Sequence, residues 1–389
     1  MIAGQDITIL GAGIGGLTAA VALAKRGANV TVLEQAPAIT EVGAGLQISP
    51  NGVRVLDALG LGEAARARSM AGKGVWLRDG VSGHGVLDFD FSKVAPSASF
   101  LLFHRADLID VLADGARAAG VDIRCGVKVE AVSPSMSAAM VQTAGEDPTE
   151  MGFVIGADGL HSVVGAGLNG ARAPLFTGQV AWRATVPATG REPTEATVFM
   201  GPGRHMVTYP LRDGKIINLV AVEERQAWAA EGWNHQDDPN NLRHAFSGFC
   251  DDAQALLERV DTAHLWGLFR HPVALNWHYG QSALLGDAAH PTLPFMAQGA
   301  VMAIEDAWVL AKCLDTAGFD DGPAMYQALR RPRCERIVHA ANKNARNYHY
   351  ANPVARRLGH GALRIAGKMA PQQMFNRFRW IYDEDVTRL

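Results

Sequence analysis

Apolar runs near the start of the chain alternate with glycine-rich breaks. Residues 6–10 form a short apolar run typical of a buried strand, and the glycine-rich segment 11–16 follows directly. Residues 17–26 are predicted to form a helix that ends at Gly27, and residues 29–33 a second strand. This order predicts a βαβ unit with a parallel sheet. Further strand-like runs lie at residues 74–78, 121–124 and 151–155.

The middle of the chain, about residues 178–276, has a different pattern. It is rich in β-branched and aromatic residues, which predicts a more antiparallel sheet and a second domain. Its strand-like runs lie at residues 179–186, 196–200, 205–211 and 215–222. A short apolar strand follows at 282–285, and from residue 298 onward the chain is predicted to be mainly helical.

Composition narrows the class of protein. The 389 residues, 48% of them hydrophobic, are enough for a large core and two or three domains. A formal net charge of −3 gives no basic field that would bind nucleic acid or an acidic membrane. The four cysteines are widely separated without a C-x-x-C, which fits reduced thiols in a cytoplasmic protein and gives no reason to expect a metal site. The arginines at 330, 331, 333 and 336 are interpreted as a solvated helix face.

The apolar stretch 7–24 could be mistaken for a signal peptide or a membrane span. It follows Asp6 rather than a basic segment, and it contains four glycines, which suit a tight turn better than a spanning helix. No other run is long enough to span a bilayer, so we expect no membrane partner.

The glycine-rich segment matches the dinucleotide-binding pattern G-x-G-x-x-G. The motif residues of interest are Gly11, Gly13, Ile14, Gly15 and Gly16. Glycines there permit the turn, the approach of a pyrophosphate and close helix–strand packing, while helix amides face the phosphate charge. Glu34, at the end of the second strand, is placed to bind ribose hydroxyls. This context favours a nucleotide site over a plain glycine turn, without distinguishing FAD from NAD.

A second match to the pattern, at residues 165–170, is rejected. No adequate strand precedes it, and Pro174 follows too soon for a helix. The chain therefore offers one dinucleotide-binding domain.

A second cofactor segment is predicted near residue 287. The strand 282–285 ends in a loop that carries Asp287, whose carboxylate suits ribityl or ribose hydroxyls. A helix then opens at Gly299, where its N-terminus can stabilise negative charge on a reduced flavin ring. Taken alone, an ordinary strand–turn–helix is an equally good interpretation.

These motifs occur in an order that resembles a known enzyme family. Residues 11–16, residues 155–162, and Gly286-Asp287 with residues 291–299 resemble the three signatures of the single-component FAD-dependent aromatic hydroxylases, most closely the salicylate and 3-hydroxybenzoate hydroxylases. Residues 43–47, 104–108, 201–210 and 380–382 resemble further segments of these enzymes, so the likeness covers nearly the whole chain. One departure is Gly165, where the family usually carries an arginine.

The resemblance implies an α/β fold in which a Rossmann-like FAD-binding domain is interleaved with an antiparallel-sheet substrate domain, as in para-hydroxybenzoate hydroxylase. Because the cofactor motifs lie on both sides of the β-rich middle, we expect residues 1–75, 97–178 and 275–350 to form the FAD-binding domain. Residues 76–96 and 179–274 are then the substrate domain, and residues 351–389 a C-terminal helical segment.

The resemblance also implies a monooxygenase reaction. In this family NAD(P)H binds transiently and reduces FAD, reduced flavin and O2 give a C4a-hydroperoxide, and this species hydroxylates an electron-rich ring. The implied partners are NAD(P)H, O2 and a small phenolic or carboxylated aromatic substrate, and a homodimer is possible. The expected cofactor-binding residues are Gly11, Gly13, Ile14, Gly15, Gly16, Glu34, Gln35, Gly45, Arg105, Asp158, Asp287, Gly299 and Ala300.

Four residues are candidates for the chemistry. Pro291 is expected beside the flavin edge, and Gln47 near the ring and the substrate. His205 and Tyr209 lie four apart on a predicted strand, so both point to one face, and a histidine there suits deprotonation of a phenol. A hydrogen-bonded structural histidine is an interpretation of equal weight.

Two neighbouring side chains leave alternatives open. His290 is expected to brace its loop. Arg183 could meet a substrate carboxylate or the nicotinamide nucleotide, but a surface or interdomain ion pair is at least as good an interpretation.

Two other functions stay open. One is another flavin oxidoreductase on this fold, such as a dehydrogenase, oxidase or halogenase, although the halogenase-like W-x-W-x-I-P segment is absent. The other is a non-catalytic escort or regulatory protein that retains the fold. Oxygen consumption coupled to hydroxylation would identify the monooxygenase, whereas the non-catalytic protein would not oxidise NAD(P)H.

Overall fold

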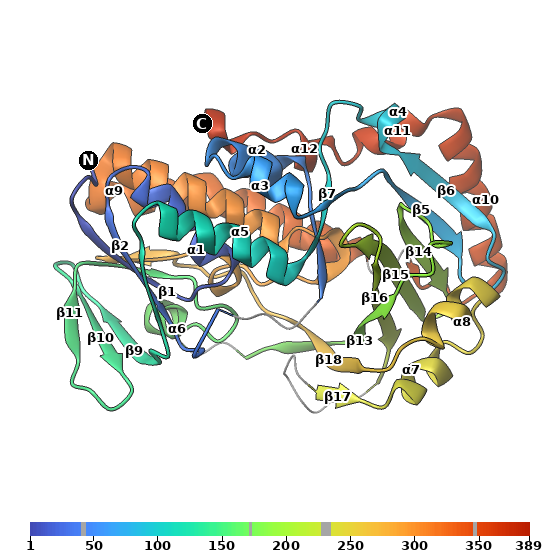
Figure 1. Cartoon of the computed structure of the whole chain (residues 1–389), viewed down its shortest axis with the longest axis horizontal. Helices are drawn as coiled ribbons and strands as arrows, with labels where there is room; N and C mark the ends of the chain where they lie inside the picture. Colours follow the sequence, from blue (N-terminus) through green and yellow to red (C-terminus); the bar gives the residue numbers. More distant parts are fainter. Residues whose placement is uncertain (40–43, 171–172, 227–234, 345–347) are drawn as a thin grey trace.

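Two layered regions lie side by side in the molecule. The computed structural model describes residues 1–39, 44–170, 173–226, 235–344 and 348–389. A mainly parallel sheet with its helices forms one end, and a large, mainly antiparallel sheet forms the other (Figure 1). This is the mixed α/β fold expected from the sequence, although the exact domain boundaries stay a prediction.

The parallel sheet takes its strands from both ends of the chain. Its order is β19 (His278–Tyr279), β20 (Ser282–Leu284), β12 (Phe153–Gly156), β1 (Asp6–Leu10), β2 (Asn29–Glu34) and β8 (Asp122–Cys125). The five strands from β20 to β8 run parallel, and β19 pairs antiparallel at the edge. The carboxyl ends of the parallel strands therefore meet along one edge of the sheet.

Helix α1 (Ile14–Ala24) explains why the first apolar stretch is so uniform. It is buried on nearly all sides because it packs against α5 (Arg105–Ala118) and α9 (Gly299–Asn344). The helix begins at Ile14, earlier than expected, since Gly11 makes the turn with φ +102° and Gly13 is already extended. The neighbouring helices of this region are α2 (Pro50–Ala58), α3 (Gly62–Ala67) and α6 (Val163–Asn169).

The second sheet has eight strands. Their order is β17 (His235–Asp237), β18 (Ala263–Arg270), β13 (Leu175–Pro187), β16 (Ile216–Glu224), β15 (Arg204–Leu211), β14 (Ala196–Gly201), β5 (Gly74–Asp79) and β6 (Gly85–Asp90). Its outer face is covered by α7 (Pro239–Ala245) and α8 (Asp251–Leu257), where Trp182 and Phe246 share a core. Its inner face packs on the first region, as the cluster of Tyr209 with Leu102 shows.

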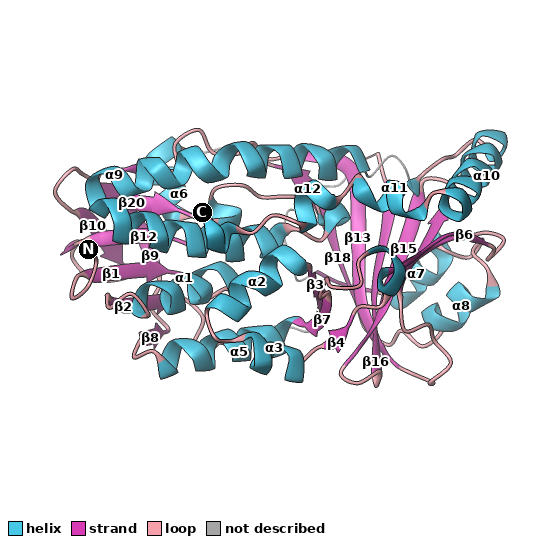
Figure 2. Cartoon of the chain, turned by 90° about the horizontal axis from the view of Figure 1, so that it is seen from above, coloured by secondary structure: helices cyan, strands magenta, loops and turns pink. Residues whose placement is uncertain are grey.

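Smaller elements join the two regions or extend them. One three-stranded sheet has the order β11 (Thr149–Met151), β10 (Ala139–Thr143) and β9 (Val129–Pro134), and a second has the order β3 (Gly45–Ile48), β7 (Leu101–His104) and β4 (Met70–Ala71). The other small elements are helix α4 (Phe91–Val94) and the short 3-10 turns η1 (Gly286–Ala288), η2 (Pro294–Met296) and η4 (Val386–Arg388). The C-terminal helices are α10 (Pro353–Met369), α11 (Pro371–Asn376) and α12 (Arg379–Tyr382). Helix α10 lies along β6 at the far end of the large sheet (Figure 2).

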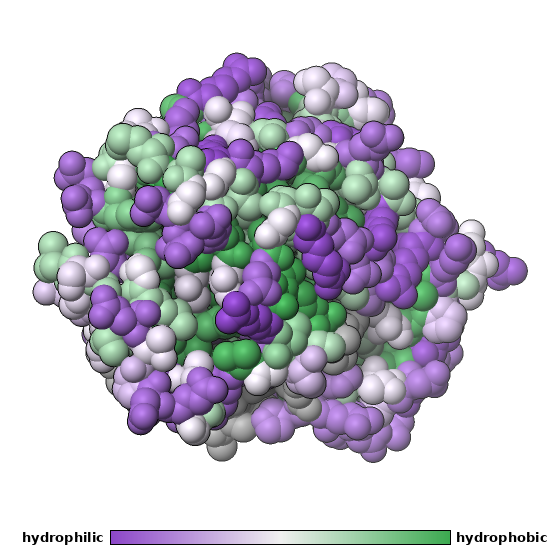
Figure 3. All heavy atoms as spheres, turned by 60° about the vertical axis from the view of Figure 1, so that its left-hand side comes forward, coloured by the Kyte–Doolittle hydropathy of each residue, from purple (hydrophilic) through white to green (hydrophobic). Residues whose placement is uncertain are grey.

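The surface is mixed in character. On the face shown in Figure 3, hydrophobic residues gather near the middle, with hydrophilic residues around them. Among the helices that the structure describes, none has the length and apolar character needed to cross a bilayer.

The rejected glycine pattern is confirmed not to be a phosphate loop of its own. Gly165 and Gly167 lie inside helix α6 rather than in a loop before a helix. A Cβ at Gly167 would lie 2.5 Å from the Val132 carbonyl oxygen, so this glycine is needed for packing on β9.

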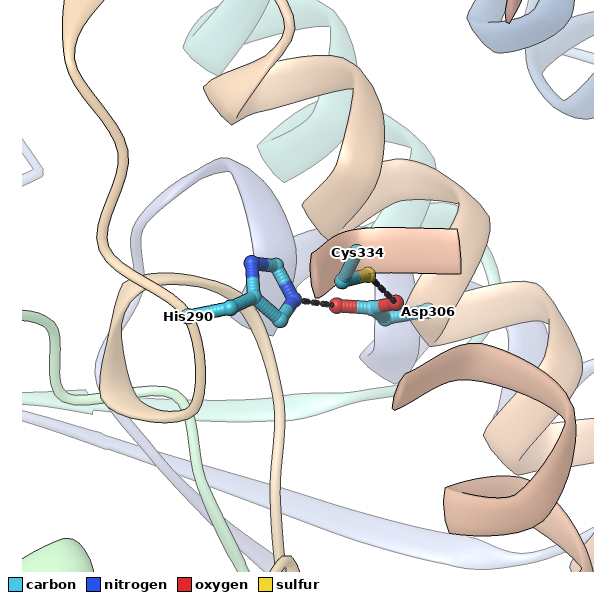
Figure 4. Close-up of side chains that lie close together, drawn as sticks. All are labelled: His290, Asp306 and Cys334. Atoms are coloured by element: carbon cyan, nitrogen blue, oxygen red, sulfur yellow. Dashed lines mark hydrogen bonds and ion pairs between the residues drawn. The ribbon is translucent and has the colours of Figure 1, made fainter. Parts of the chain in front are cut away.

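A buried cluster of charges holds the first region together. Helix α9 is interrupted at Gly318 (φ +74°), and the arginines of its second half fold back onto the carboxylates of its first half. Arg330 bonds Asp306 (2.8 Å) and Glu305 (2.6 Å), and Arg333 bonds Glu305 (2.9 Å). In Figure 4 the other oxygen of Asp306 faces His290 and the Cys334 thiol lies beside the carboxylate.

The cluster corrects the interpretation of the C-terminal arginines. Side chains of Arg330 and Arg333 are 1% and 11% exposed, so they are not a solvated helix face. Arg336 lies over the Trp380 ring, 3.8 Å from its centroid. The sequence shows these charges, but not the carboxylates that the fold places opposite them.

We predict a large difference between two adjacent arginines. Arg330→Met should lower the free energy of unfolding by about 3–5 kcal/mol, because Asp306 loses its guanidinium partner in the core and Glu305 keeps only Arg333. Arg331→Met should cost less than about 1 kcal/mol, because Arg331 pairs with Glu335 near the surface. Urea unfolding followed by circular dichroism measures both. Equal effects of the two substitutions would contradict a structural role of the cluster.

Candidate active site

The candidate site lies where four strand ends of the parallel sheet meet. Gly11 follows β1, Glu34 ends β2, Asp158 lies just beyond β12, and Asp287 just beyond β20. These strands are direct neighbours in the order β20, β12, β1 and β2. The carboxyl edge of an open parallel sheet is where such folds bind their ligands.

The glycines of the loop have two different roles. A Cβ at Gly11 would lie 2.5 Å from the carbonyl oxygen of Ala157. A Cβ at Gly16 would lie 2.0 Å from the carbonyl oxygen of Gly11, and a Cβ at Gly15 would lie 2.6 Å from the Leu285 side chain. The protein itself therefore requires glycine at these positions. A Cβ at Gly13 would meet nothing within 4 Å, so the open space above Gly13 is available to a ligand. Ile14, which starts α1, is buried in the core.

Glu34 is held at the end of β2. Its carboxylate accepts hydrogen bonds from the backbone amides of Ala12 (2.7 Å) and Ala36 (2.8 Å). Two carboxylate oxygens have about four acceptor sites, so lone pairs remain for hydroxyl groups of a ligand. The neighbouring Gln35 is exposed, and in the described part of the chain its side chain forms no hydrogen bond.

Two further carboxyls are perturbed by their surroundings. Asp158 accepts a hydrogen bond from the Val163 amide (2.8 Å), while its Oδ1 is buried without a partner, and burial raises its pKa. Asp287 is open to solvent at the sheet edge, yet the protein around it desolvates the carboxyl and raises its pKa. The positive charge of Arg105, at the start of α5, acts against that increase. Both carboxyls are thus placed to accept donors from a bound molecule.

The loop from Gly286 to Ala300 runs along the same edge. The Gly286 amide donates to Asp306 (3.1 Å), and His290 contacts the same carboxylate oxygen, so both ends of this turn are fixed to α9. Burial opposes a charge on His290, but Cys334 and Asp306 outweigh it and raise its pKa well above the ordinary value. This agrees with the loop-bracing role expected for His290.

The end of this loop is held against α2. Gln298, which is buried, donates to the Ser49 hydroxyl (2.9 Å), and Ala297 before it has the left-handed φ of +51°. Pro291, Gly299 and Ala300 are half-buried at the two ends of this segment. The start of α9 is thereby presented toward the junction of the two regions.

Gly45 and Tyr209 make the contact between the two regions. A Cβ at Gly45 would lie 2.6 Å from Cε2 of Tyr209 and 2.7 Å from Asn218, so only glycine allows this approach. The Gly45 amide donates to Asn218 Oδ1 (2.7 Å), while Nδ2 of Asn218 is buried without a partner. Burial raises the pKa of Tyr209, so its hydroxyl stays protonated.

A small cavity of about 40 Å³ lies at this junction. Residues around it include Gln47, Ser49, Leu102, Ala196, Gln298 and Tyr382. Tyr209 packs on Leu102 and Ala196, two of the residues that line this cavity.

His205 lies on the same inner face as Tyr209 but does not line that cavity. It is 2% exposed, and its ring lies 5.7 Å from the Phe295 ring of the loop before α9. Its Nδ1 is 2.7 Å from Nε2 of His349, whose Nδ1 is 2.9 Å from the Glu224 carboxylate. Burial, together with His349, holds the pKa of His205 well below its ordinary value, so the ring is neutral.

Arg183 faces the same junction from β13. Its guanidinium lies over the Trp266 ring, 4.4 Å from the centroid, and its charge acts on Tyr209. This places a cation near the inner face of the sheet.

Several residues of the site were not foreseen. Asn218, His349 and Glu224 carry no motif of their own, and each becomes relevant only through a partner more than forty residues away. The available signal was the presence of polar residues, Asn218 with Glu223 and Glu224, in an otherwise apolar strand run.

The observed donors and acceptors fit FAD. An open glycine loop at a helix N-terminus suits a pyrophosphate, Glu34 suits ribose hydroxyls, and the orphan Asp158 oxygen and Asp287 can accept further hydroxyl groups. When bound, FAD would be held by these residues with its ring toward the junction.

We predict that alanine substitutions at two glycines of the loop have different effects, one on FAD binding and the other on the stability of the fold. Gly13→Ala should weaken FAD binding by about tenfold, equivalent to about 1.4 kcal/mol, without lowering the unfolding temperature of the FAD-free protein. Gly16→Ala should lower that temperature, because its Cβ would overlap the Gly11 oxygen. Fluorescence titration with FAD and thermal unfolding measure the two effects. If Gly13→Ala binds FAD as tightly as the wild type does, FAD does not occupy the space above Gly13.

Comparison with known proteins agrees with this geometry. Residues 5–341 match the family described as FAD binding domain. The chain is 32% identical to 3-amino-4-hydroxybenzoate 2-monooxygenase PtmB3 of Streptomyces platensis, over 97% of this chain and 95% of that protein. It is 33% identical to 3-hydroxybenzoate 6-hydroxylase of Polaromonas naphthalenivorans (strain CJ2), over 98% and 96%. A salicylate hydroxylase substrate complex has the same fold, with a TM-score of 0.83, 22% identity, and 99% and 97% coverage. The chain therefore belongs to the FAD-binding family of flavin-dependent aromatic hydroxylases, as its motifs indicated.

Proposed function

We propose that this protein uses NAD(P)H and O2 to hydroxylate a small phenolic compound, with His205 as the base that ionises the phenol. The observation that carries the proposal is the buried His205 on the inner face of the large sheet, 2.7 Å from His349 and beside the Phe295 ring of the loop before α9. A base draws a proton from the phenol, and the resulting phenolate is the more electron-rich ring. The relatives' names, which include hydroxybenzoates, support a phenolic acid as the substrate.

The residues divide into a cofactor set and a substrate set. When bound, FAD supplies electron transfer from NAD(P)H to O2 and delivery of one oxygen atom to the ring. The glycine loop, Glu34 and Asp287 hold the cofactor, with Gln35, Arg105, Asp158 and Ala300 as further contacts. Pro291 and Gly299 border the ring, and the N-terminus of α9 stabilises negative charge there.

The substrate set lies on the inner face of the large sheet. Gln47 lines the junction cavity, and Tyr209 packs on two residues of its lining and keeps its proton as a donor. These two side chains orient the ring. Arg183 supplies a positive charge for a substrate carboxylate. The apolar side chains packed on this face, such as Leu102 and Leu211, limit the access of water to the reacting ring.

Two features support the cosubstrate and the compartment. The single valid glycine loop leaves no second dinucleotide domain in the described residues, which fits transient binding of NAD(P)H. The cysteines are free thiols, which fits a cytoplasmic enzyme.

We expect a screen of hydroxybenzoates to reveal the activity. Salicylate, 3-hydroxybenzoate or 3-amino-4-hydroxybenzoate should accelerate NAD(P)H oxidation, with one hydroxylated product for each NAD(P)H consumed. Benzoate, which lacks the phenol, is the control and should not be hydroxylated. If no phenol changes the rate of NAD(P)H oxidation, the proposal fails.

His205→Ala should lower the hydroxylation rate by about a hundredfold, while FAD content stays unchanged. Reduction by NAD(P)H should continue, because hydride transfer does not use this base, and the O2 consumed should appear as hydrogen peroxide. His84→Ala removes an exposed histidine far from the site and is the matched control. The ratio of product to NAD(P)H consumed measures the effect, and an unchanged ratio and rate would assign His205 to structure.

The pH dependence should have a defined sign. Because the pKa of His205 is held well below 6.5, the base stays neutral at pH 7 and is lost only as the pH falls through that lowered value. We therefore expect the hydroxylation rate of the wild type to decline on the acid side with a midpoint below 6.5. A midpoint above 6.5 in stopped-flow measurements would contradict the buried neutral base.

A further inference from the structure

A buried base needs a route by which its proton reaches solvent. His205 is 2% exposed and His349 6%, whereas the Glu224 side chain is 54% exposed. The three groups are joined at 2.7 Å and 2.9 Å, so they form a continuous line from the inner face of the sheet to the surface. Neighbouring strands β15 and β16 carry His205 and Glu224 (Figure 1).

We propose that His349 and Glu224 form a relay that carries the phenol proton from His205 to solvent. The inference rests on the proposed function, because it needs a phenol that ionises in the site. His349 and Glu224 act through His205 and do not touch the substrate, so they are positioning residues rather than catalytic ones.

The carboxylate of Glu224 determines the direction of both hydrogen bonds in this line. An ionised Glu224 only accepts hydrogen bonds, so Nδ1 of His349 carries the hydrogen and its Nε2 is an acceptor. Nδ1 of His205 must then be the donor to His349, which leaves Nε2 of His205 with a free lone pair. The surface carboxylate of Glu224 thus sets, through His349, the tautomer in which His205 can act as a base.

The proton balance of the relay is simple. Nε2 of His205 forms a bond to the phenol proton as the O–H bond breaks, and Nδ1 of His205 gives its own proton to Nε2 of His349. His349 in turn passes its Nδ1 proton to Glu224, which releases it to water. No oxidant or further reactant is needed.

Other charged side chains near His349 are paired with groups outside the line from His205 to Glu224. Arg204 lowers the pKa of His349, in the same direction as burial, while Glu224 raises it. Arg204 and Arg225 are themselves paired with Glu223, at 3.4 Å and 2.9 Å. Gln179 lies 3.5 Å from Nδ1 of His349, farther than Glu224, and the Gly203 amide donates to the His349 carbonyl at 3.4 Å. His349 is therefore held by its backbone with its ring between His205 and Glu224.

The chain supplies a matched control for testing the relay. Glu224→Gln keeps the shape and one acceptor oxygen but cannot take up a proton at neutral pH. Glu223→Gln makes the same change at the adjacent residue, whose carboxylate bonds Arg204 and Arg225 instead of His349. Retained FAD content and unfolding temperature establish that both variants are folded.

The first measurement does not depend on any substrate. In FAD-loaded protein with 15N-labelled histidine, Glu224→Gln should change the tautomer and lower the pKa of His349 and alter the His205 nitrogens, whereas Glu223→Gln should not. Equal spectra for wild type and Glu224→Gln, or equal changes in both variants, would overturn the relay. This result stands even if no phenol is turned over and the proposed function fails.

The second measurement follows the proton itself. Stopped-flow absorbance records formation of phenolate when 3-hydroxybenzoate binds the oxidised holoenzyme. Glu224→Gln should slow this step by about tenfold, less than loss of His205, and added formate should restore part of the rate. His349→Asn should behave similarly, whereas Glu223→Gln should match the wild type. A wild-type rate in Glu224→Gln, or the same loss in Glu223→Gln, would refute the relay.

Discussion

The buried pairing of Glu305 and Asp306 with Arg330 and Arg333 is the constraint on which the rest of the structure depends. It fixes the two halves of α9 to one another across the break at Gly318. Through His290 and the Gly286 amide, the same carboxylate fixes the loop that follows β20. Asn51 joins Glu305 from α2 at 2.7 Å, and Arg333 bonds the carbonyl oxygens of Trp380 and Ile381 in the C-terminal segment. Four segments far apart in sequence are thereby held around one group of charges. Since removing one partner of such a group leaves a buried charge, the arrangement is strongly specified.

This arrangement also explains why the group is an ion-pair network rather than a metal centre. His290, Asp306 and Cys334 offer ligand atoms within 4.8 Å of one another, a spacing that could suit a cation. Arg330 already neutralises Asp306 at 2.8 Å, and the guanidinium would repel a metal ion. The pKa of Asp306 falls to about 2 because His290 and Arg330 outweigh its burial. The carboxylate is thus permanently charged and acts as a fixed anchor for the cofactor-side loop.

The large sheet has two faces with different tasks. Its outer face is an ordinary apolar core, in which Trp182 and Phe246 pack under α7 and α8. On its inner face, by contrast, the buried His205 and Tyr209 and the half-buried Arg183 are polar groups turned toward the first region. Burying polar groups is costly unless they are paired. Here His205 has His349 as its partner, and the Arg183 guanidinium lies over the Trp266 ring. Because successive side chains of β15 point to opposite faces of the sheet, residues that pack in the outer core alternate with residues that face the site.

The sequence by itself determined the features that depend on local pattern. The glycine loop with its strand and helix, the β-rich middle and the shared face of His205 and Tyr209 follow from periodicities of 3.6 and 2, and the order of motifs identified the family. What local pattern cannot carry is a partner distant in the chain. The burial of Arg330 needed the fold-back at Gly318, the separate role of Gly13 needed the surroundings of all four glycines, and the line from His205 to Glu224 needed His349, 144 residues beyond His205, to return to the sheet. Charges and hydrogen-bond donors are visible in a sequence, but their energies depend on distance and burial, and only the tertiary structure decided these.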